Sequence, residues 1–133
     1  MATLDSVCVR DYMSTRLVTF TPDMEVMTAI NLLVTHGITG APVVDGEGKL
    51  VGILSDRDCL TVGLLAAQDS CVAGPVRQFM STNTITVEPD MNLTRLASMF
   101  LSKPYRRYPV VEDGKLVGQI SRSDVMRAIN SMC

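Results

Sequence analysis

The sequence predicts a mixed helix-and-strand fold of the α/β (α+β) class, made of two copies of one β-α-β-β-α unit. The first observation is an internal repeat, in which Gly48–Asp58 returns as Gly114–Asp124 and Pro42–Val44 returns as Pro109–Val111. The offset falls from 67 to 66 residues after the turn Asp45–Gly48, so one residue is deleted there. The second observation is that apolar runs of strand length alternate with helical spacing in both copies. A length of 133 residues fits one domain or two tightly packed half-domains.

The first copy begins with a short β-type run, Leu17–Phe20. Thr21 and Pro22 then predict a helix start, with threonine as the N-cap and proline at the first helical position. We expect Gly37 to end this helix. The predicted buried stripe is Val26, Ile30, Leu33 and Val34. The remaining elements are the strands Pro42–Asp45 and Leu50–Leu54 and a helix that is capped by Ser55 and striped by Cys59, Leu60, Gly63, Leu64 and Ala67.

The second copy follows the same plan. Asp113 and Gly114 form a two-residue hairpin turn of the kind that favours positive φ. The predicted elements are the strand Ile85–Val87, a helix striped by Leu93, Leu96, Ala97, Phe100 and Leu101, the strands Tyr108–Glu112 and Lys115–Ile120, and a helix striped by Val125, Met126, Ile129 and Met132. We expect the repeats at residues 7–67 and 76–130, joined by a connector at 68–75. Packing the two sheets together, with pseudo-twofold symmetry, would cover both and leave clefts at the seam.

The composition excludes several classes of protein. A formal net charge of −2 does not fit the basic face that nucleic-acid binding requires. No apolar run reaches membrane-spanning length, and the N-terminus lacks the pattern of a secretory signal. The cysteines Cys8, Cys59, Cys71 and Cys133 have no C-x-x-C spacing, which indicates reduced thiols in a cytoplasmic protein. We therefore expect neither a nucleic-acid nor a membrane partner, and no metal or resident cofactor.

Both copies carry Gly-x-x-Ser-x-x-Asp at the end of the third strand, as Gly52, Ser55 and Asp58 and again sixty-six residues later. The serine lies where a helix begins, a position whose free N–H groups and dipole favour an anion. A carboxylate one turn further on can accept from both hydroxyls of a ribose. The same spacing is also that of a capping box, in which the acidic side chain only bonds the helix start. A capping box leaves the strand glycine unexplained, because such a glycine often marks close approach of a backbone or a ligand.

The segment between helix and second strand differs between the copies. Residues 37–42 are small and apolar and could lie against a flat adenine. Residues 104–109 include Arg106 and Arg107, which could neutralise phosphates, and two tyrosines, one of which could stack on a base. Close packing in the first copy, and solvated arginines with interfacial tyrosines in the second, are the structural alternatives. The difference predicts two unequal clefts.

No pattern of an activated nucleophile or of a metal cluster occurs in the sequence. His36 is the only histidine, and it is expected at a helix end. A hydrolytic triad and a zinc site therefore have little support.

These residues resemble the cystathionine-β-synthase (CBS) domain, and the chain resembles one tandem pair of such domains, a Bateman module. The matching segments are residues 12–14, 41–45 and 50–58 in the first copy and residues 79–81, 108–112 and 116–124 in the second, within an overall span of 7–130. The resemblance implies two repeats packed through their sheets, a homodimer, and binding of AMP, ADP or ATP, or of S-adenosylmethionine or NAD. It also implies a sensor. Because we expect no effector domain to be attached to this pair, its output is either a separate effector protein or unknown.

The resemblance further implies a ligand-binding set. In this set Asp58 and Asp124 hold ribose hydroxyls, and Ser55 and Ser121 lie beside ribose or phosphate. The residues that would frame the base are Val18, Thr19, Gly40, Ala41 and Pro42 in the first copy and Ile85, Thr86, Arg107, Tyr108 and Pro109 in the second. The residues that would contact phosphate are Arg57, Arg106 and Arg107.

Two hypotheses of different class follow. The leading one is a non-enzymatic regulatory module that binds adenosine nucleotides in clefts between the repeats. The alternative is a ligand-free module for dimerisation and protein interaction, in which the Ser-x-x-Asp motifs only cap helices.

Overall fold

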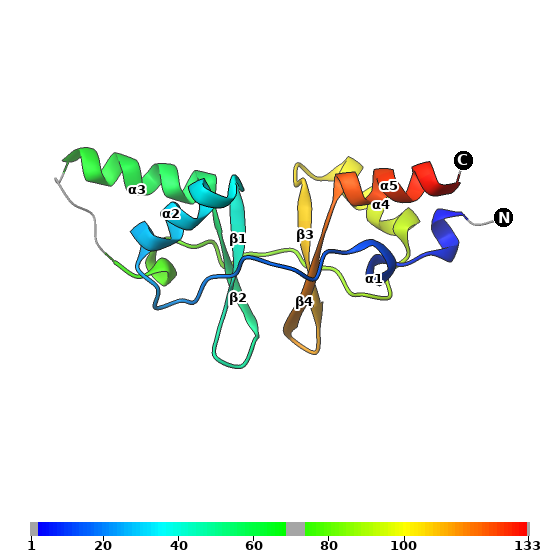
Figure 1. Cartoon of the computed structure of the whole chain (residues 1–133), viewed down its shortest axis with the longest axis horizontal. Coiled ribbons are helices and arrows are strands. Elements are labelled where there is room, and N and C mark those ends of the chain that lie inside the picture. The colour runs from blue at the N-terminus through cyan, green and yellow to red at the C-terminus, as the bar shows by residue number, and fades with distance from the viewer. Residues whose placement is uncertain (1–2, 69–73, 133) are drawn as a thin grey trace. The chain divides into compact units, whose positions relative to one another are not determined.

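The computed structural model describes residues 3–68 and 74–132 (Figure 1). It confirms the mixed fold, since each repeat contributes a strand pair that is followed directly by a helix. In chain order the elements are η1 (Leu4–Ser6), α1 (Val9–Tyr12), α2 (Val26–His36), β1 (Gly40–Val44), β2 (Leu50–Ser55), α3 (Asp56–Gln68), η2 (Val76–Gln78), α4 (Leu93–Ser102), β3 (Arg107–Glu112), β4 (Lys115–Ser121) and α5 (Arg122–Met132).

The chain forms two compact units. Unit 1 consists of Met1–Leu17 together with Ile85–Cys133, and unit 2 of Val18–Thr84. Each unit therefore takes its strand pair from one repeat and a leading segment from the other. We call the leading segments the arms: residues 7–14 in unit 1 and residues 74–81 in unit 2. The repeat boundaries at 7–67 and 76–130 describe the sequence pattern and stay a prediction.

Each unit is built on an antiparallel strand pair, β1 with β2 and β3 with β4. The predicted first strand of each repeat is reduced to one bridging residue, Phe20 or Val87. Phe20 donates its N–H to Pro42 O at 2.9 Å and accepts from Val44 N at 2.9 Å. The predicted hairpin turn is confirmed, since Asp113 and Gly114 have φ values of 53° and 79°.

The helix α2 begins at Val26, so the predicted start at Thr21 and Pro22 is wrong. The reason lies in the arm of unit 2, which pairs with this stretch of backbone. Pro22 O accepts from Arg77 N at 3.0 Å, and Val26 N donates to Gly74 O at 2.9 Å. These bonds hold the residues before Val26 outside the helix. The predicted end is confirmed, because Gly37 adopts the left-handed conformation with φ of 64°.

The arms explain the two strand glycines. Ser81 exchanges two backbone hydrogen bonds with Ile53, each 2.9 Å long. A Cβ atom on Gly52 would lie 2.9 Å from Ser81 O and 2.7 Å from Met80 Sδ. Unit 1 repeats this arrangement, with a Cβ on Gly118 lying 3.0 Å from Ser14 O. The strand glycines thus admit the backbone of an arm.

The helices bury less of their apolar stripes than the sequence predicts. Buried positions on α2 and α4 include Leu33, Leu96 and Phe100, whereas Val34 is 76% exposed and Leu101 is 90% exposed. The stripe residues Leu60, Leu64, Met126 and Ile129 on the two other helices are exposed as well. A helical pattern identifies an apolar face, but it does not say whether the same chain covers that face.

Cys8 and Cys59 are free thiols. Burial, followed by the charges of Asp58 and Asp56, raises the pKa of the Cys59 thiol above its ordinary value. Cys71 and Cys133, and most of the predicted connector, lie outside the described residues. Within residues 3–68 and 74–132, no helix combines the length and the apolar character that a membrane crossing needs.

Candidate functional site

The candidate residues gather at the end of each strand pair that lies away from the hairpin turn. In unit 2, Gly40 pairs with Ser55 across β1 and β2, and Asp56 N donates to Thr39 O at 2.7 Å. Val18 packs against the core cluster that contains Ala41. In unit 1, Arg107 pairs with Ser121, and Ile85 packs against the core cluster that contains Tyr108. Each predicted set therefore lies within a single compact unit.

The serine and the aspartate of each motif form a capping box at the start of a helix. In unit 2, Asp58 Oδ2 accepts from Ser55 N at 2.9 Å and from Ser55 Oγ at 3.0 Å. In unit 1, Asp124 Oδ2 accepts from Ser121 N at 2.8 Å and from Ser121 Oγ at 3.0 Å. The inner oxygen, Oδ2, of each carboxylate therefore accepts hydrogen bonds from the serine at the start of its own helix. An ionised carboxylate has further acceptor sites, mainly on the outer oxygen Oδ1.

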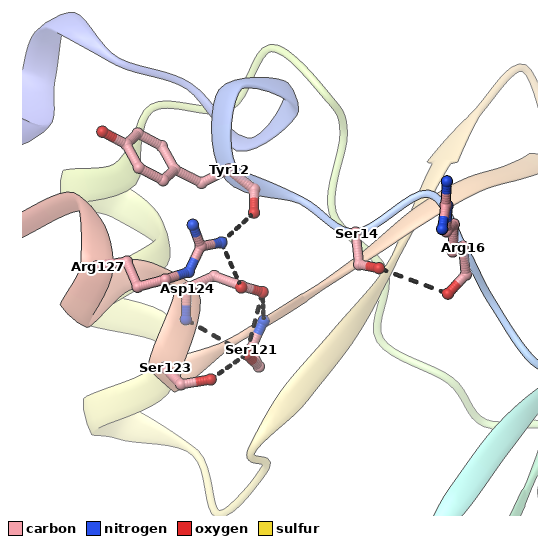
Figure 2. A network of polar contacts seen from close by, with 7 residues as sticks. All are labelled: Tyr12, Ser14, Arg16, Ser121, Ser123, Asp124 and Arg127. Atoms are coloured by element: carbon pink, nitrogen blue, oxygen red, sulfur yellow. Dashed lines mark hydrogen bonds and ion pairs between the residues drawn. The ribbon is translucent and has the colours of Figure 1, made fainter. Parts of the chain in front are cut away.

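The two outer oxygens have different partners. Asp58 Oδ1 accepts from the hydroxyl of Ser81 at 3.1 Å. Asp124 Oδ1 instead pairs with the guanidinium of Arg127 at 2.8 Å. Figure 2 shows Arg127 between the Asp124 carboxylate and the carbonyl of Tyr12. The first carboxylate thus contacts a neutral group, and the second contacts a cation.

The remaining candidates differ in exposure. The exposed ones are Thr19, Arg57, Thr86, Arg106 and Arg107. The buried ones are Ala41, Pro42, Tyr108 and Pro109, so a ligand could meet only their edges or their backbone. The half-buried ones are Val18, Gly40, Ser55, Asp58, Ile85, Ser121 and Asp124.

Tyr108 is a core residue, whereas the sequence left open a tyrosine that stacks on a base and a tyrosine at an interface. Its side chain is 1% exposed, and its ring lies 4.9 Å from that of Phe100. The hydroxyl donates to Met99 O at 3.3 Å. Burial, with a smaller contribution from Tyr105, raises the pKa of the Tyr108 hydroxyl above its ordinary value. The exposed Tyr105 is the tyrosine of this segment whose ring can reach a ligand.

Arg122 holds the segment that carries Arg106 and Arg107. Its guanidinium donates to Tyr105 O at 3.1 Å and to Phe100 O at 3.0 Å. The Phe100 carbonyl lies in the last turn of α4, which does not end at a left-handed glycine as α2 does, and the Tyr105 carbonyl lies in the loop that follows. Arg122 therefore orders the loop before β3.

Sequence reasoning missed Ser81, Arg122 and Arg127. The repeated Met-Ser-Thr segment was a usable signal for Ser81, because it recurs without a role in either repeat. For Arg127 the only signal is a difference between the copies, in which Thr61 stands at the equivalent position.

A surface groove and a metal cluster are the two other kinds of site to compare with the candidate residues. A groove of about 480 Å³ in unit 1 is lined by Thr86, Val87, Glu88, Asp90, Met91 and Arg95. Thr86 is the single candidate residue in this lining, so the groove does not coincide with the candidate site. Among the described residues, no three His, Cys, Asp or Glu side chains are grouped to hold a metal ion.

The doubled strand pair, the exchanged arms and the paired Ser-x-x-Asp motifs define a tandem-repeat module. The chain belongs to the CBS domain family, whose profile matches residues 9–64 and 76–131.

Three relatives are similar over nearly the whole chain. CBS domain-containing protein YhcV of Bacillus subtilis is 32% identical, over 93% of this chain and 85% of its own length. The crystal structure of CBSX2 in complex with AMP matches with a TM-score of 0.81 and 35% identity, over 94% of this chain and 97% of CBSX2, an Arabidopsis thaliana protein. The CBS domain pair of MJ0100, in complex with 5′-methylthioadenosine and S-adenosyl-L-methionine, matches with a TM-score of 0.75 and 26% identity, over 96% and 98% of the two chains.

Other curated relatives are much longer than this chain. It spans 14% of an A-adding tRNA nucleotidyltransferase of Aquifex aeolicus and 23% of an inosine-5′-monophosphate dehydrogenase of Methanocaldococcus jannaschii. The module therefore occurs both in short proteins and within larger enzymes.

Proposed function

We propose that this chain is a non-enzymatic regulatory module that binds an adenosine nucleotide of the AMP, ADP or ATP type in each unit. The observation that carries the proposal is the outer oxygen of Asp58, held at the start of α3 beside Ser55. The AMP complex of CBSX2, at 35% identity, and the adenosine ligands of the MJ0100 pair support this ligand class. S-adenosylmethionine and NAD share the adenosine moiety and are further candidates.

The chemistry of each unit suits the two ends of a nucleotide. A ribose diol would donate to the outer carboxylate oxygen, and its phosphate would lie near the helix N-terminus, where N–H groups favour an anion. The exposed arginines Arg57, Arg106 and Arg107 supply positive charge for the phosphate. Val18 and Thr19 with Gly40, and Ile85 and Thr86 in the second copy, are the proposed frame of the base.

Regulation would then follow from differential binding. A nucleotide that binds one arrangement of the module more tightly shifts the population toward it, and a separate effector protein would respond to that arrangement. No step of this mechanism needs a reaction at the nucleotide.

A second candidate function is favoured by the capping boxes. If Asp58 and Asp124 serve only their helices, the chain is a ligand-free module for dimerisation and protein interaction. The bonds from Ser55 N and Ser121 N to the carboxylates are those that this alternative requires.

Replacing Asp58 by glutamate is expected to separate the two functions. Glutamate is the usual acid at this place in a capping box, so the free energy of unfolding should stay within about 0.5 kcal/mol of the wild type. The longer side chain moves the outer oxygen away from the diol, and we expect AMP affinity in unit 2 to fall at least about tenfold, which is about 1.4 kcal/mol. Isothermal titration with AMP, ATP, S-adenosylmethionine and NAD measures the affinity, and urea unfolding measures the stability.

The control is Asp58→Ala, which removes both the cap and the proposed contact. It should lose affinity and also about 0.5–2 kcal/mol of stability. Absence of binding heat from all four ligands with the wild-type chain would favour the module without a ligand.

We further propose that the module forms a homodimer through its helices. In Figure 1 the two helices of each unit lie on the same side of its strand pair. Two pairs of equivalent positions in the two repeats are apolar and exposed. Val34 corresponds to Leu101, and Leu60 corresponds to Met126. Exposed apolar faces of this kind mark protein interfaces. A second copy presents the same faces, which suits a twofold-symmetric contact.

The variant Leu101→Lys is expected to weaken this dimer. A cation at a position that is 90% exposed in the single chain costs nothing within the unit, but it would be desolvated in the interface. Sedimentation equilibrium should give about twice the chain mass of 14.5 kDa for the wild type and the single mass for the variant. Thr28→Lys, at an exposed polar position on α2, is the control and should leave the dimer intact. A monomeric wild type at high micromolar concentration would contradict the proposal.

A further inference from the structure

The carboxylate of Asp124 is partly neutralised by its own chain. Its side chain is 16% exposed, and its outer oxygen pairs with Arg127 Nη2 at 2.8 Å, while Ser121 occupies the inner oxygen (Figure 2). A carboxylate that already has a cationic partner is a weaker acceptor for further donors, because bonds to an unpaired charge are the stronger ones.

Arg127 is held in this position by a second group. The same Nη2 atom donates to Tyr12 O at 3.1 Å, and the guanidinium carbon lies 5.7 Å from the centre of the Tyr12 ring. The Tyr12 hydroxyl in turn lies 2.9 Å from Ser131 Oγ. Most exposed ion pairs are weak because two mobile side chains must be ordered. Here the arm of unit 1 orders the arginine independently of Asp124.

The first copy has a neutral residue at the position equivalent to Arg127. Thr61 occupies the position equivalent to Arg127, and its hydroxyl bonds the carbonyl of Arg57 at 3.5 Å. Within residues 3–68 and 74–132, the one hydrogen-bond donor to the outer oxygen of Asp58 is the Ser81 hydroxyl, at 3.1 Å. A hydroxyl leaves the negative charge of Asp58 in place, so a ribose diol meets a full carboxylate in unit 2.

We infer that Arg127 sets the difference in nucleoside affinity between the two units, by competing with the ribose diol for Asp124. This inference rests on the proposed function and assigns a specificity-determining role to one residue. Unit 2 is then the tighter site. The size of the effect is that of a well-ordered surface ion pair, which corresponds to about a two- to fivefold difference in dissociation constant.

The test exchanges the residues of the two copies. Arg127→Thr gives unit 1 the residue of unit 2, and Thr61→Arg does the reverse. The probe is adenosine, because it has the diol but no phosphate that an arginine could attract. The amide signals of Ser55 and Ser121 in two-dimensional NMR report the two sites separately, since both amides donate to the carboxylates in question.

In the wild type we expect the Ser55 signal to titrate at the lower adenosine concentration. Arg127→Thr should lower the midpoint at Ser121 about two- to fivefold and leave that at Ser55 unchanged. Thr61→Arg should raise the midpoint at Ser55 by a similar factor, and it does not disturb the contact with Tyr12. Parallel thermal melts check that both variants are folded.

The outcomes distinguish this inference from the proposed function. Saturable binding with an unchanged or raised Ser121 midpoint in Arg127→Thr, together with an unchanged Ser55 midpoint in Thr61→Arg, would overturn the role of Arg127 alone. Absence of any shift at both amides, with AMP as well as adenosine, would overturn the proposed function and this inference with it.

Discussion

Replacing Gly52 by alanine is expected to destabilise the protein by about 1–3 kcal/mol, the usual cost of an added methyl group in tight packing. The new Cβ would lie 2.9 Å from Ser81 O and 2.7 Å from Met80 Sδ. The methionine side chain can move aside, but the carbonyl belongs to a backbone that exchanges two hydrogen bonds with Ile53. Relief of the contact therefore weakens this pairing. Urea unfolding followed by circular dichroism measures the loss.

A matched variant is available in the same unit. Gly63 lies within α3 and has no positive φ, and apart from its chain neighbours and the adjacent backbone of α3, no atom of the described residues lies within 4 Å of the place where a Cβ would be added. Gly63→Ala is expected to stabilise the chain by about 0.5–1 kcal/mol, because glycine is unfavourable inside a helix. Equal effects at Gly52 and Gly63 would show that the arm does not pack as described. Gly118→Ala should resemble Gly52→Ala, with Ser14 O at 3.0 Å from the added carbon.

Replacing Tyr108 by alanine is expected to cost about 3–5 kcal/mol, as for other large aromatic residues removed from a core. The ring is 1% exposed and packs on Phe100 at 4.9 Å. Tyr108→Phe keeps the ring and loses one hydrogen bond, to Met99 O, so we expect a loss of about 0.5–1.5 kcal/mol. Thermal and urea unfolding of the two variants give both values.

The neighbouring tyrosine provides the comparison. Tyr105 is 45% exposed, and its ring makes an edge contact with Tyr108 at 5.9 Å. Tyr105→Ala keeps the carbonyl that Arg122 bonds and should cost about 1 kcal/mol, the value of an aromatic pair. A Tyr108→Ala variant as stable as Tyr105→Ala would mean that Tyr108 is not a core residue and would favour the interfacial alternative that the sequence left open.

Local signals account for most of what could be predicted from the sequence. The turn at Asp113 and Gly114 and the helix end at Gly37 depend on backbone conformations that few residues adopt, so their positions are readable from residue type. The Ser-x-x-Asp motifs likewise predicted that a serine and an aspartate lie at the start of a helix, because a capping box spans only four consecutive residues.

Features that depend on distant parts of the chain were not predictable in the same way. The start of α2 is set by backbone hydrogen bonds with Gly74, which accepts from Val26, and with Arg77, which donates to Pro22, about fifty residues further on. The partner of Asp58 is Ser81, in the arm supplied by the second repeat, and Arg127 owes its position to Tyr12, 115 residues away. The exposure of Val34 depends on whether another segment covers that side of α2. The apolar pattern of the helix does not contain this information.

Because each unit contains an arm from the other repeat, a gene fragment that encodes one repeat alone does not encode a complete unit. Truncation after residue 67 would retain Ile53 and delete Ser81, so the outer edge of β2 would lose its backbone partner and present open N–H and C=O groups. The second repeat expressed alone would lack residues 7–14 and would leave Gln119 unpaired for the same reason. A workable excision or fusion point for unit 2 therefore lies beyond Ser81, inside the second repeat, and not at the boundary that the duplication marks.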